Sequence, residues 1–325
     1  MSSHLSSDLG NYDVEAARDA VATIAIKTPT IRSPNLAKND AAEIFLKLES
    51  LQVTGSFKVR GAANRILALT QEEKRRGVVT CSSGNHGRAV AYVAERLEIP
   101  ATVCVPEWVD PVKLAAIRSH GADAVLCGAT YDAAEEKSFE IEQDRGLTYI
   151  HPFDDPYVIA GQGTIGLELI DQIQPLDAVV VPLSGGGLIA GIAVALKSSQ
   201  PAIQLIGVSA LNASVMVESL KVGKPIACAE EQTIANALSG GIGLGNKHTF
   251  PIVRDYVDTH VLVSESRIRE AMLFAAREHR LIVEGGGAVG IAAMLDNAIH
   301  ETGRIAVVVS GGNVDLEQLA RLQSP

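Results

Sequence analysis

The chain has 325 residues, of which 47% are hydrophobic, 20% are charged and only 4% are aromatic. A chain of this length can bury a large core, and it favours two lobes over one. The formal net charge of −10, with no basic cluster to offset it, argues against a nucleic-acid surface. Alanine, valine, isoleucine and glycine must fill the interior, as in α/β proteins with apolar parallel strands.

Three features bear on the cellular compartment. Met1 to Asp8 lacks the basic start and apolar run of a signal peptide. The uncharged stretch 178–196 is long enough to raise the question of a membrane span, but Pro182 and the run Ser184 to Gly187 interrupt it. No C-x-x-C pair occurs among the cysteines, which we expect to be free thiols: Cys81, Cys104, Cys127 and Cys228. We therefore expect a cytoplasmic protein without a membrane span.

Apolar runs and helical patterns alternate along the chain. In the middle of the chain they predict strands and helices in turn at 78–81, 88–97, 101–105, 112–120, 124–127 and 131–145. Further on they predict strands at 178–181, 204–208 and 305–309, and helices at 189–197, 268–279 and 288–295. Such alternation predicts an α/β fold of parallel sheets with right-handed crossovers.

The two lobes are not expected to follow one another along the chain. The first compact series of strands and helices covers residues 76–152, which we expect to form a small inserted domain. Residues 1–75 are expected to join residues 153–325 in a larger domain.

Lys58 lies in the segment Ser56 to Ala62 (SFKVRGA), between Phe57 and Val59 and behind a Thr54-Gly55 turn. Apolar neighbours can desolvate a lysine, which lowers its pKa until the amine is nucleophilic enough to form a Schiff base. Most lysines beside apolar residues simply lay their stems on the surface. The functional interpretation gains weight because three glycine-rich segments follow in order.

The first segment to consider is Ser184-Gly185-Gly186-Gly187-Leu188, which follows a predicted strand and opens a predicted helix. Glycines allow the backbone to approach an anion, and several N–H groups converge at the positive end of the helix dipole. The segment lacks the lysine of a nucleotide-binding P-loop, so it favours a monophosphate. The alternative is a turn that serves packing alone.

A second segment, Ser82-Ser83-Gly84-Asn85-His86-Gly87, also follows a predicted strand and opens a helix. Ligands bind at such strand ends in open α/β sheets. Its hydroxyl, amide and N–H groups can form a cradle for a substrate carboxylate, and Asn85 can reach a phenolic oxygen on a cofactor. The alternative is a cluster of helix N-caps, with His86 in a structural role.

The third segment, Ser310-Gly311-Gly312-Asn313, ends the last apolar strand. A serine hydroxyl that faces a pyridine nitrogen leaves it largely unprotonated, which suits β-elimination. Glu284 precedes three glycines and is either a helix cap or a cofactor contact. No set of ligand-type residues has metal-site spacing, so no metal is expected. Lys58 and the three segments can together hold the different parts of pyridoxal phosphate.

The motifs SFKVRGA, SSGNHG, AGQGTIG (Ala160 to Gly166), SGGGLIAG and SGGNVD occur in this order. With them the chain resembles the fold-type II pyridoxal-phosphate enzymes, and within these the serine/threonine dehydratases and serine racemases. The resemblance extends from about Thr28 to Leu316. It implies a two-lobed, tryptophan synthase β-like fold in which each lobe is a parallel-rich sheet flanked by helices.

The resemblance also implies roles for single residues. Lys58 would carry the cofactor and Phe57 would pack on it, while Asn85 would contact the cofactor hydroxyl. The backbone of Ser184 to Leu188 would hold the phosphate, and Ser310 would meet the ring nitrogen. Ser83 would lie on the face opposite Lys58, where racemases of this family place their second acid or base and many threonine dehydratases have alanine.

Some positions depart from parts of the family. Ser209 and Val215 stand where the magnesium-binding branch has carboxylates, so that site is expected to be lost. Ala134 lies near the position where some racemases have an arginine for dicarboxylate ligands. The chain ends soon after SGGNVD, which favours a catabolic role without a regulatory domain. The stretch Gly240 to Asn246, with Thr249-Phe250 beyond it, resembles the dehydratases of hydroxyectoine catabolism.

The leading hypothesis is therefore an ammonia-lyase that converts a β-hydroxy-α-amino acid such as L-threonine or L-serine to a 2-oxo acid and ammonia. Racemisation through Ser83 and a hydroxyectoine-related substrate are the alternatives, and β-replacement ranks lower. A nicotinamide oxidoreductase lacks its fingerprint here, and intact Lys58 argues against a non-catalytic amino-acid sensor. As partners we expect a small amino-acid substrate and a second copy of the chain in a homodimer, with no nucleic acid or membrane.

Overall fold

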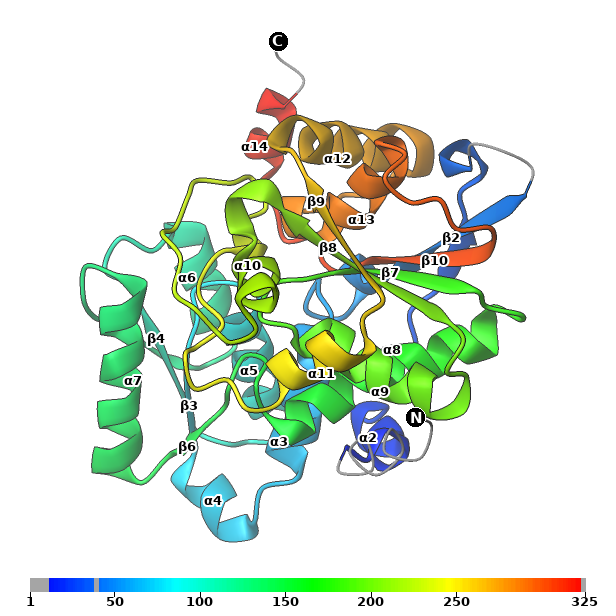
Figure 1. Ribbon diagram of the computed structural model, residues 1–325. Helices are drawn as coiled ribbons and strands as arrows, with labels where there is room; N and C mark the ends of the chain where they lie inside the picture. Colours follow the sequence, from blue (N-terminus) through cyan, green and yellow to red (C-terminus); the bar gives the residue numbers. More distant parts are fainter. Residues whose placement is uncertain (1–11, 38–40, 323–325) are drawn as a thin grey trace.

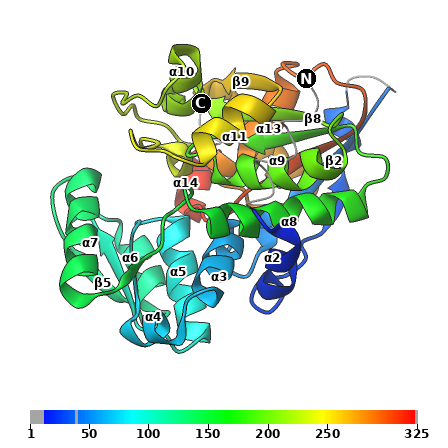
Figure 2. The same cartoon turned by 60° about the horizontal axis from the view of Figure 1, so that its bottom comes forward.

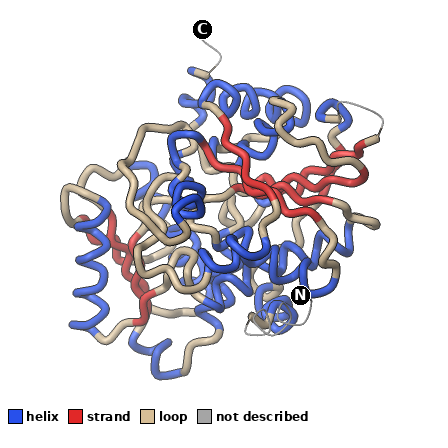
Figure 3. The backbone as a smooth tube through the Cα atoms, viewed as in Figure 1, coloured by secondary structure: helices blue, strands red, loops and turns tan. Residues whose placement is uncertain are grey.

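The computed structural model describes residues 12–37 and 41–322. The N-terminal stretch Met1 to Asp8, considered above for a signal peptide, lies outside the described residues. The strands form two separate sheets, one of six strands and one of four, and helices cover both (Figures 1 and 3). The α/β class with parallel-rich sheets is confirmed.

The large sheet has the strand order β1-β2-β10-β7-β8-β9. All neighbours are parallel except β1 and β2, which pair antiparallel with Thr30 opposite Lys47. Its strands are β1 (Thr30–Arg32), β2 (Ala42–Leu48), β7 (Ala178–Pro182), β8 (Gln204–Ala210), β9 (Thr259–Val263) and β10 (Gly303–Val309). The parallel pairing of β2 with β10 places a strand from the N-terminal part of the chain beside one from its C-terminal part.

The small sheet is wholly parallel and has the order β5-β4-β3-β6. Its strands are β3 (Val78–Cys81), β4 (Ala101–Val105), β5 (Asp123–Leu126) and β6 (Thr148–Tyr149). The helices that connect or flank them are α5 (Asn85–Arg96), α6 (Pro111–Arg118) and α7 (Tyr131–Arg145). All of these elements lie within the range 76–152 that we expect to form the small domain.

Helices cover both faces of the large sheet because its central strands are apolar on both sides. Along β10, Ala306 and Val308 face one hydrophobic cluster, whereas Ile305, Val307 and Val309 face the other. The first cluster includes helices α8 (Pro156–Gln172), α9 (Gly187–Ser199) and α11 (Thr249–Tyr256). The second includes α12 (Glu265–His279) and α13 (Gly285–Leu295), on the opposite side of the sheet in Figure 1.

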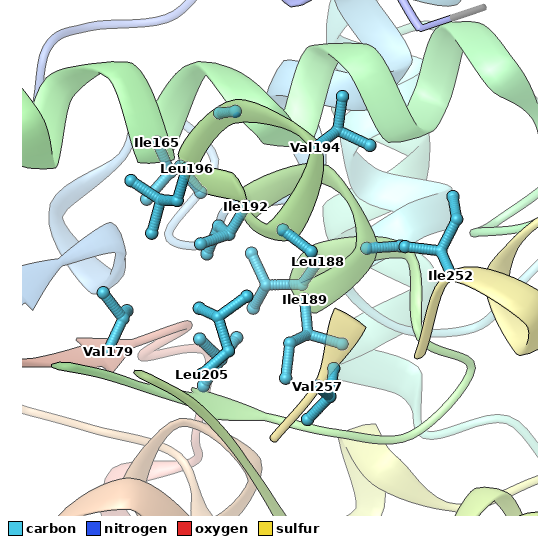
Figure 4. Packing of buried hydrophobic residues seen from close by; sticks show 14 of the residues in the cluster. Ile165, Val179, Leu188, Ile189, Ile192, Val194, Leu196, Leu205, Ile252 and Val257 are labelled. Carbon is cyan, nitrogen blue, oxygen red and sulfur yellow. The ribbon is translucent and has the colours of Figure 1, made fainter. Parts of the chain in front are cut away.

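Helix α9 is almost wholly apolar and buried on nearly all sides. Its side chains pack between the sheet and α8, where Leu188, Ile192 and Leu196 belong to the same hydrophobic cluster as Val179 and Leu205 of the sheet (Figure 4). This burial fixes the start of α9, and therefore the glycine-rich loop before it, against the large sheet.

Helix α3 (Lys58–Leu67) lies between the two lobes. It contacts α8 of the large lobe and α5 of the small one, and α8 separates it from α9 (Figure 2). Val59, Ala62 and Ile66 share a hydrophobic cluster with Val90 of α5. The remaining α-helices of the described residues are α2 (Val14–Val21), α4 (Gln71–Arg76), α10 (Val215–Val222) and α14 (Leu316–Arg321). The two-domain division with boundaries at 75 and 152 stays a prediction.

The structure corrects several predicted helix starts. The helix expected from 268 begins at Glu265, and the helices expected from 88, 189 and 288 begin at Asn85, Gly187 and Gly285, within or beside the glycine-rich motifs. Glycine and asparagine have low helix propensity, so the motif residues did not register as helical. The first turn tolerates them because its N–H groups have no partner within the helix. Within the described residues, no helix is long and apolar enough to cross a membrane.

Candidate active site

Lys58 is placed by the end of strand β10. Ser56 forms an antiparallel bridge with Gly311, and the Phe57 N–H donates to the Ser310 carbonyl oxygen over 3.0 Å. These contacts hold the turn before α3 against the carboxyl edge of the large sheet, where ligands bind in open α/β folds. Phe57, Lys58 and Ser310 are thus brought together.

The amine of Lys58 is half-buried and has a neutral partner. Its Nζ donates to the Pro152 carbonyl oxygen over 2.6 Å and lies 5.2 Å from the centre of the Phe57 ring. Within the described part of the chain, no carboxylate forms an ion pair with it. Burial therefore lowers the pKa of Lys58 to about 8. Such an amine is a better nucleophile and base near neutral pH than an exposed lysine.

The glycine-rich loop lies beside Phe153, the residue after Pro152, whose carbonyl accepts the hydrogen bond from Lys58. Phe153 packs so closely on the loop that a Cβ on Gly185 would lie 2.5 Å from its ring, and one on Gly187 would lie 2.9 Å from its Cα. Gly186 has a left-handed φ of 87°, which glycine adopts without strain, and it is the N-cap of α9. The first N–H groups of α9 are therefore presented as an anion-binding edge.

The side chains that flank these glycines point elsewhere. The Ser184 hydroxyl donates to the Leu238 carbonyl oxygen over 2.8 Å. Leu188 is buried in the core cluster around α9 (Figure 4). Any contact of Leu188 with a phosphate must therefore go through its backbone N–H.

Asn85 and Glu284 meet across the two lobes. The Asn85 side-chain amide donates to Glu284 Oε1 over 2.6 Å, and Asn85 Oδ1 accepts from the Asn313 amide over 2.7 Å. Glu284 is the N-cap residue of α13, but its side chain makes no capping hydrogen bond. Burial raises the pKa of Glu284 to about 7, although the bond from Asn85 opposes this shift. Glu284 thus belongs to a polar cluster rather than to a simple cap.

The other residues of the second motif occupy the turn between β3 and α5. Ser82 Oγ accepts from the Gly84 N–H over 3.2 Å, and Gly84, with no side-chain capping bond, is the N-cap of α5. Ser83 and Asn85 are half-buried. The N-cap alternative for the serines is therefore not what the structure shows.

His86 lies inside the protein and is only 3% exposed. Its Nε2 donates to the Ile150 carbonyl oxygen over 2.9 Å. Burial, together with the nearby Lys58, lowers the pKa of His86 to about 3, so the ring is neutral at physiological pH. Its expected part in substrate binding stays a prediction.

The positions that depart from the family pattern have ordinary surroundings. Ser209 is buried and donates to the Leu183 carbonyl oxygen over 2.6 Å, while Val215 begins α10. Ala134 is buried in α7. Among the residues that the structure describes, no group of three or more His, Cys, Asp or Glu side chains could hold a metal ion.

Sequence reasoning did not find Asp154 or the structural role of Thr249. The Asp154 carboxylate accepts hydrogen bonds from three backbone N–H groups at 247–249. The Thr249 hydroxyl donates to the Gly185 carbonyl oxygen over 2.7 Å. No local signal could have shown this, because Asp154 and Thr249 are 95 residues apart in the chain.

Together these features define a class of enzyme. A lysine amine with a lowered pKa lies at the carboxyl edge of a parallel sheet, beside a glycine loop shaped for an anion. That combination suits a cofactor that has a carbonyl group and a phosphate.

Comparison with known proteins agrees with this class. Residues 21–311 match the family described as "Pyridoxal-phosphate dependent enzyme". The L-threonine ammonia-lyase of Thermotoga maritima is 40% identical over 310 residues, which cover 95% of this chain and 77% of that protein. Maize serine racemase has a TM-score of 0.90 at 36% identity, with 95% of each chain covered. The processed form of threonine deaminase isoform 2 from Solanum lycopersicum has a TM-score of 0.91 at 36% identity, with 98% of this chain and 88% of that one covered.

The chain belongs to the family of pyridoxal-phosphate dependent enzymes, and its fold is that of the fold-type II group. Its cofactor is pyridoxal phosphate. The residues present fit this group, because the Lys58 amine has no charged partner among the described residues and Gly185 to Gly187 add no side chains of their own beside the N–H groups that begin α9.

Proposed function

We propose that the chain is an ammonia-lyase that converts L-threonine or L-serine to a 2-oxo acid and ammonia. The observation that carries the proposal is the buried Lys58 amine, held beside the glycine loop in a chain 40% identical to an L-threonine ammonia-lyase. The reaction needs a base at the substrate α-carbon and a site that holds the amino acid in one orientation.

Lys58 supplies the base in this proposal. Pyridoxal phosphate, when bound, withdraws electron density from the α-carbon of the amino acid and so makes its proton acidic. The neutral Nζ of Lys58 accepts that proton. Because burial lowers the pKa of Lys58 to about 8, a usable fraction of the amine is neutral near physiological pH.

Other residues bind and orient. The N–H groups from Gly185 to Leu188 would bind the phosphate, and Ser310 and Asn85 would contact the cofactor ring nitrogen and hydroxyl. The turn from Ser82 to His86 holds the substrate carboxylate through its hydroxyl and backbone N–H groups. Support for this arrangement comes from the position of every one of these residues at a strand end or a helix start.

Glu284 orients Asn85 through the 2.6 Å hydrogen bond between them. With a pKa of about 7, Glu284 exists in both protonation states near neutral pH. The β-hydroxyl leaves together with one proton as water, so that the substrate loses in total its α-proton, first accepted by Lys58, and its hydroxyl. The unsaturated amino acid that remains takes up water and hydrolyses to the 2-oxo acid and ammonia.

Serine racemisation is the second candidate, because Ser83 is present and the chain is similar in structure to maize serine racemase. Inversion requires a proton from the face opposite Lys58. Ser83 has only a neutral, buried histidine in its motif to assist such a transfer. Elimination, by contrast, needs a β-hydroxyl that is aligned to leave, and it needs no proton from the opposite face. We therefore rank elimination first.

The test is to incubate the enzyme with L-threonine and L-serine separately and to follow 2-oxo acid and D-amino acid together. We expect 2-oxo acid to dominate in both cases. Ser83→Ala should spare 2-oxo acid formation and reduce any D-isomer. Faster accumulation of D-serine than of pyruvate would make the chain a racemase first.

Three further points also remain proposals. They are the homodimer, the cytoplasmic location and the hydroxyectoine-related substrate that the stretch Gly240 to Asn246 favours. The relatives reported above act on threonine or serine by name, so the simple hydroxyamino acids take precedence.

A further inference from the structure

We propose that Asp154 is a positioning residue that orients the glycine loop for the cofactor phosphate and ties that loop to the segment that holds Lys58. The proposal rests on the proposed function in one respect, namely that the loop Gly185 to Gly187 binds the phosphate. It goes further in naming a residue that touches neither substrate nor cofactor and yet sets the affinity for the phosphate group.

The first step is the contact of Asp154 with the start of α11. Asp154 Oδ1 accepts from the His248 and Thr249 N–H groups over 2.9 and 2.8 Å, and Oδ2 accepts from the Lys247 N–H over 2.8 Å. Both carboxylate oxygens are engaged by backbone donors at the positive end of a helix, so the bonds are charge-assisted. They fix residues 247–249 relative to Asp154.

The second step leads from Thr249 to the glycine loop. The Thr249 hydroxyl donates to the Gly185 carbonyl oxygen over 2.7 Å and accepts from the Asn246 amide over 2.7 Å. In a planar trans peptide the carbonyl of Gly185 and the N–H of Gly186 point in opposite directions. By holding the carbonyl, Thr249 also sets the direction of the Gly186 N–H and keeps the negative oxygen turned away from an anion.

The third step leads from Asp154 back to Lys58. The N–H groups of Phe153 and Asp154 donate to His151 Nδ1 over 3.2 and 2.8 Å, which closes the segment into a turn. Burial lowers the pKa of His151 to about 4, so Nδ1 remains an acceptor at neutral pH. Within this turn, the Pro152 carbonyl receives the Lys58 amine. One carboxylate therefore links the loop and the lysine.

The test measures the dissociation constant of pyridoxal phosphate from the apoprotein, by absorbance titration, for wild type, Asp154→Asn and Asp154→Ala. Loss of charge-assisted bonds should weaken binding about ten-fold to a hundred-fold. Binding of pyridoxal, which has no phosphate, should change much less, because the effect acts through the loop. A purely structural role would weaken both ligands alike.

Asp155→Ala is the matched control. Asp155 also accepts two backbone N–H groups, those of Tyr157 and Val158, but it caps α8 and pairs with Arg65 instead of contacting α11. We expect Asp155→Ala to lower the thermal stability of the apoprotein without the selective loss of phosphate binding. Unchanged affinity in Asp154→Ala, or an equal loss in both variants, would overturn the proposal.

A second pair of variants decides the matter if the Asp154 variants fail to fold. Thr249→Val removes the bond to Gly185 and keeps the side-chain shape, whereas Thr249→Ser restores the hydroxyl. Weaker pyridoxal phosphate binding in Thr249→Val and its recovery in Thr249→Ser support the proposal, and equal affinities refute it. If the wild type binds the cofactor but releases no ammonia from L-threonine or L-serine, the proposed function is wrong. The proposal for Asp154 is not affected by that result, because the affinity measurements do not depend on turnover.

Discussion

At the scale of single residues, Lys58 derives its chemistry from what surrounds it. Its amine meets a backbone carbonyl and an aromatic ring, and burial alone lowers its pKa. By contrast, the buried Lys47 is paired with Glu168 and also bonds to the Thr28 carbonyl oxygen. The two lysines thus differ in role, because among the described residues only Lys47 has a carboxylate partner for its charge.

Replacement of Lys58 tests this role directly. Lys58→Ala should lower the rate of 2-oxo acid formation by about 10²- to 10⁴-fold or more, as expected for loss of a general base. The fold should persist, since the amine forms no ion pair within the described residues that the substitution would break. The measurement combines the steady-state rate with the unfolding temperature of the apoprotein. Lys27→Ala, at an exposed pair with Asp171, is the control and should keep the wild-type rate.

At the scale of elements, the glycine loop works because a buried strand and a buried helix hold its two ends. Strand β7 lies inside the large sheet, and α9 packs against α8 and the sheet (Figure 4). The loop therefore cannot move as a unit, and its backbone N–H groups are preorganised for an anion. Such preorganisation is what a binding site on rigid elements provides.

Gly186→Val should weaken cofactor binding far more than it lowers the stability of the apoprotein. The φ of 87° at Gly186 disfavours a β-branched residue, and a Cβ there would lie 3.0 Å from Met216 and Thr249. Gly223→Val is the control, because Gly223 has a similar φ of 83° with no atom within 4 Å of the added Cβ. Both variants incur backbone strain, so a selective loss of pyridoxal phosphate affinity in Gly186→Val identifies the binding site. Equal effects on affinity and stability would indicate a structural turn.

At the scale of the whole molecule, a buried ionic cluster ties distant parts of the chain together. Arg60 of α3 contacts Glu49 over 2.8 Å and Glu168 of α8 over 2.7 Å. Although burial disfavours the charged form of Glu49, the guanidinium of Arg60 holds the pKa of that carboxyl below its ordinary value. Arg60 lies two residues after Lys58, so the cluster fixes the position of α3, the helix that begins with Lys58.

Arg60→Leu should lower the free energy of unfolding of the apoprotein by about 3–5 kcal/mol, because it leaves buried carboxylates uncompensated. The ion pair of Glu49 stabilises the wild type above the ordinary pKa of about 4.5 and is lost as the pH falls. The difference in the free energy of unfolding between wild type and Arg60→Leu should therefore be smaller at acid pH. Denaturant unfolding at pH 7 and pH 4 measures both effects. Arg18→Ala removes an exposed pair with Glu15 and should change stability by less than about 1 kcal/mol. A comparable small change in Arg60→Leu would contradict this view of the cluster.

Much of the fold followed from local patterns, and the exceptions have physical causes. Strands β3 and β4 and helix α7 have the predicted bounds. Strand β2 was not predicted, because Glu43 and Lys47 interrupt its apolar pattern, and the partners of the buried Lys47 amine, Glu168 among them, lie far along the chain. A charged residue in a strand cannot be recognised as interior until its partner is known.

The sequence by itself determined the family, the cofactor and the local shape of each glycine-rich turn. These depend on residue type and on spacing within a few positions, which short-range sterics and hydrogen bonding translate into structure. Only the tertiary structure decided which groups meet: Lys58 with Pro152, Asn85 with Glu284, and Asp154 with the start of α11. Each of these contacts joins residues at least 93 positions apart, and it exists because the packing of two sheets and their helices brings the strand ends together.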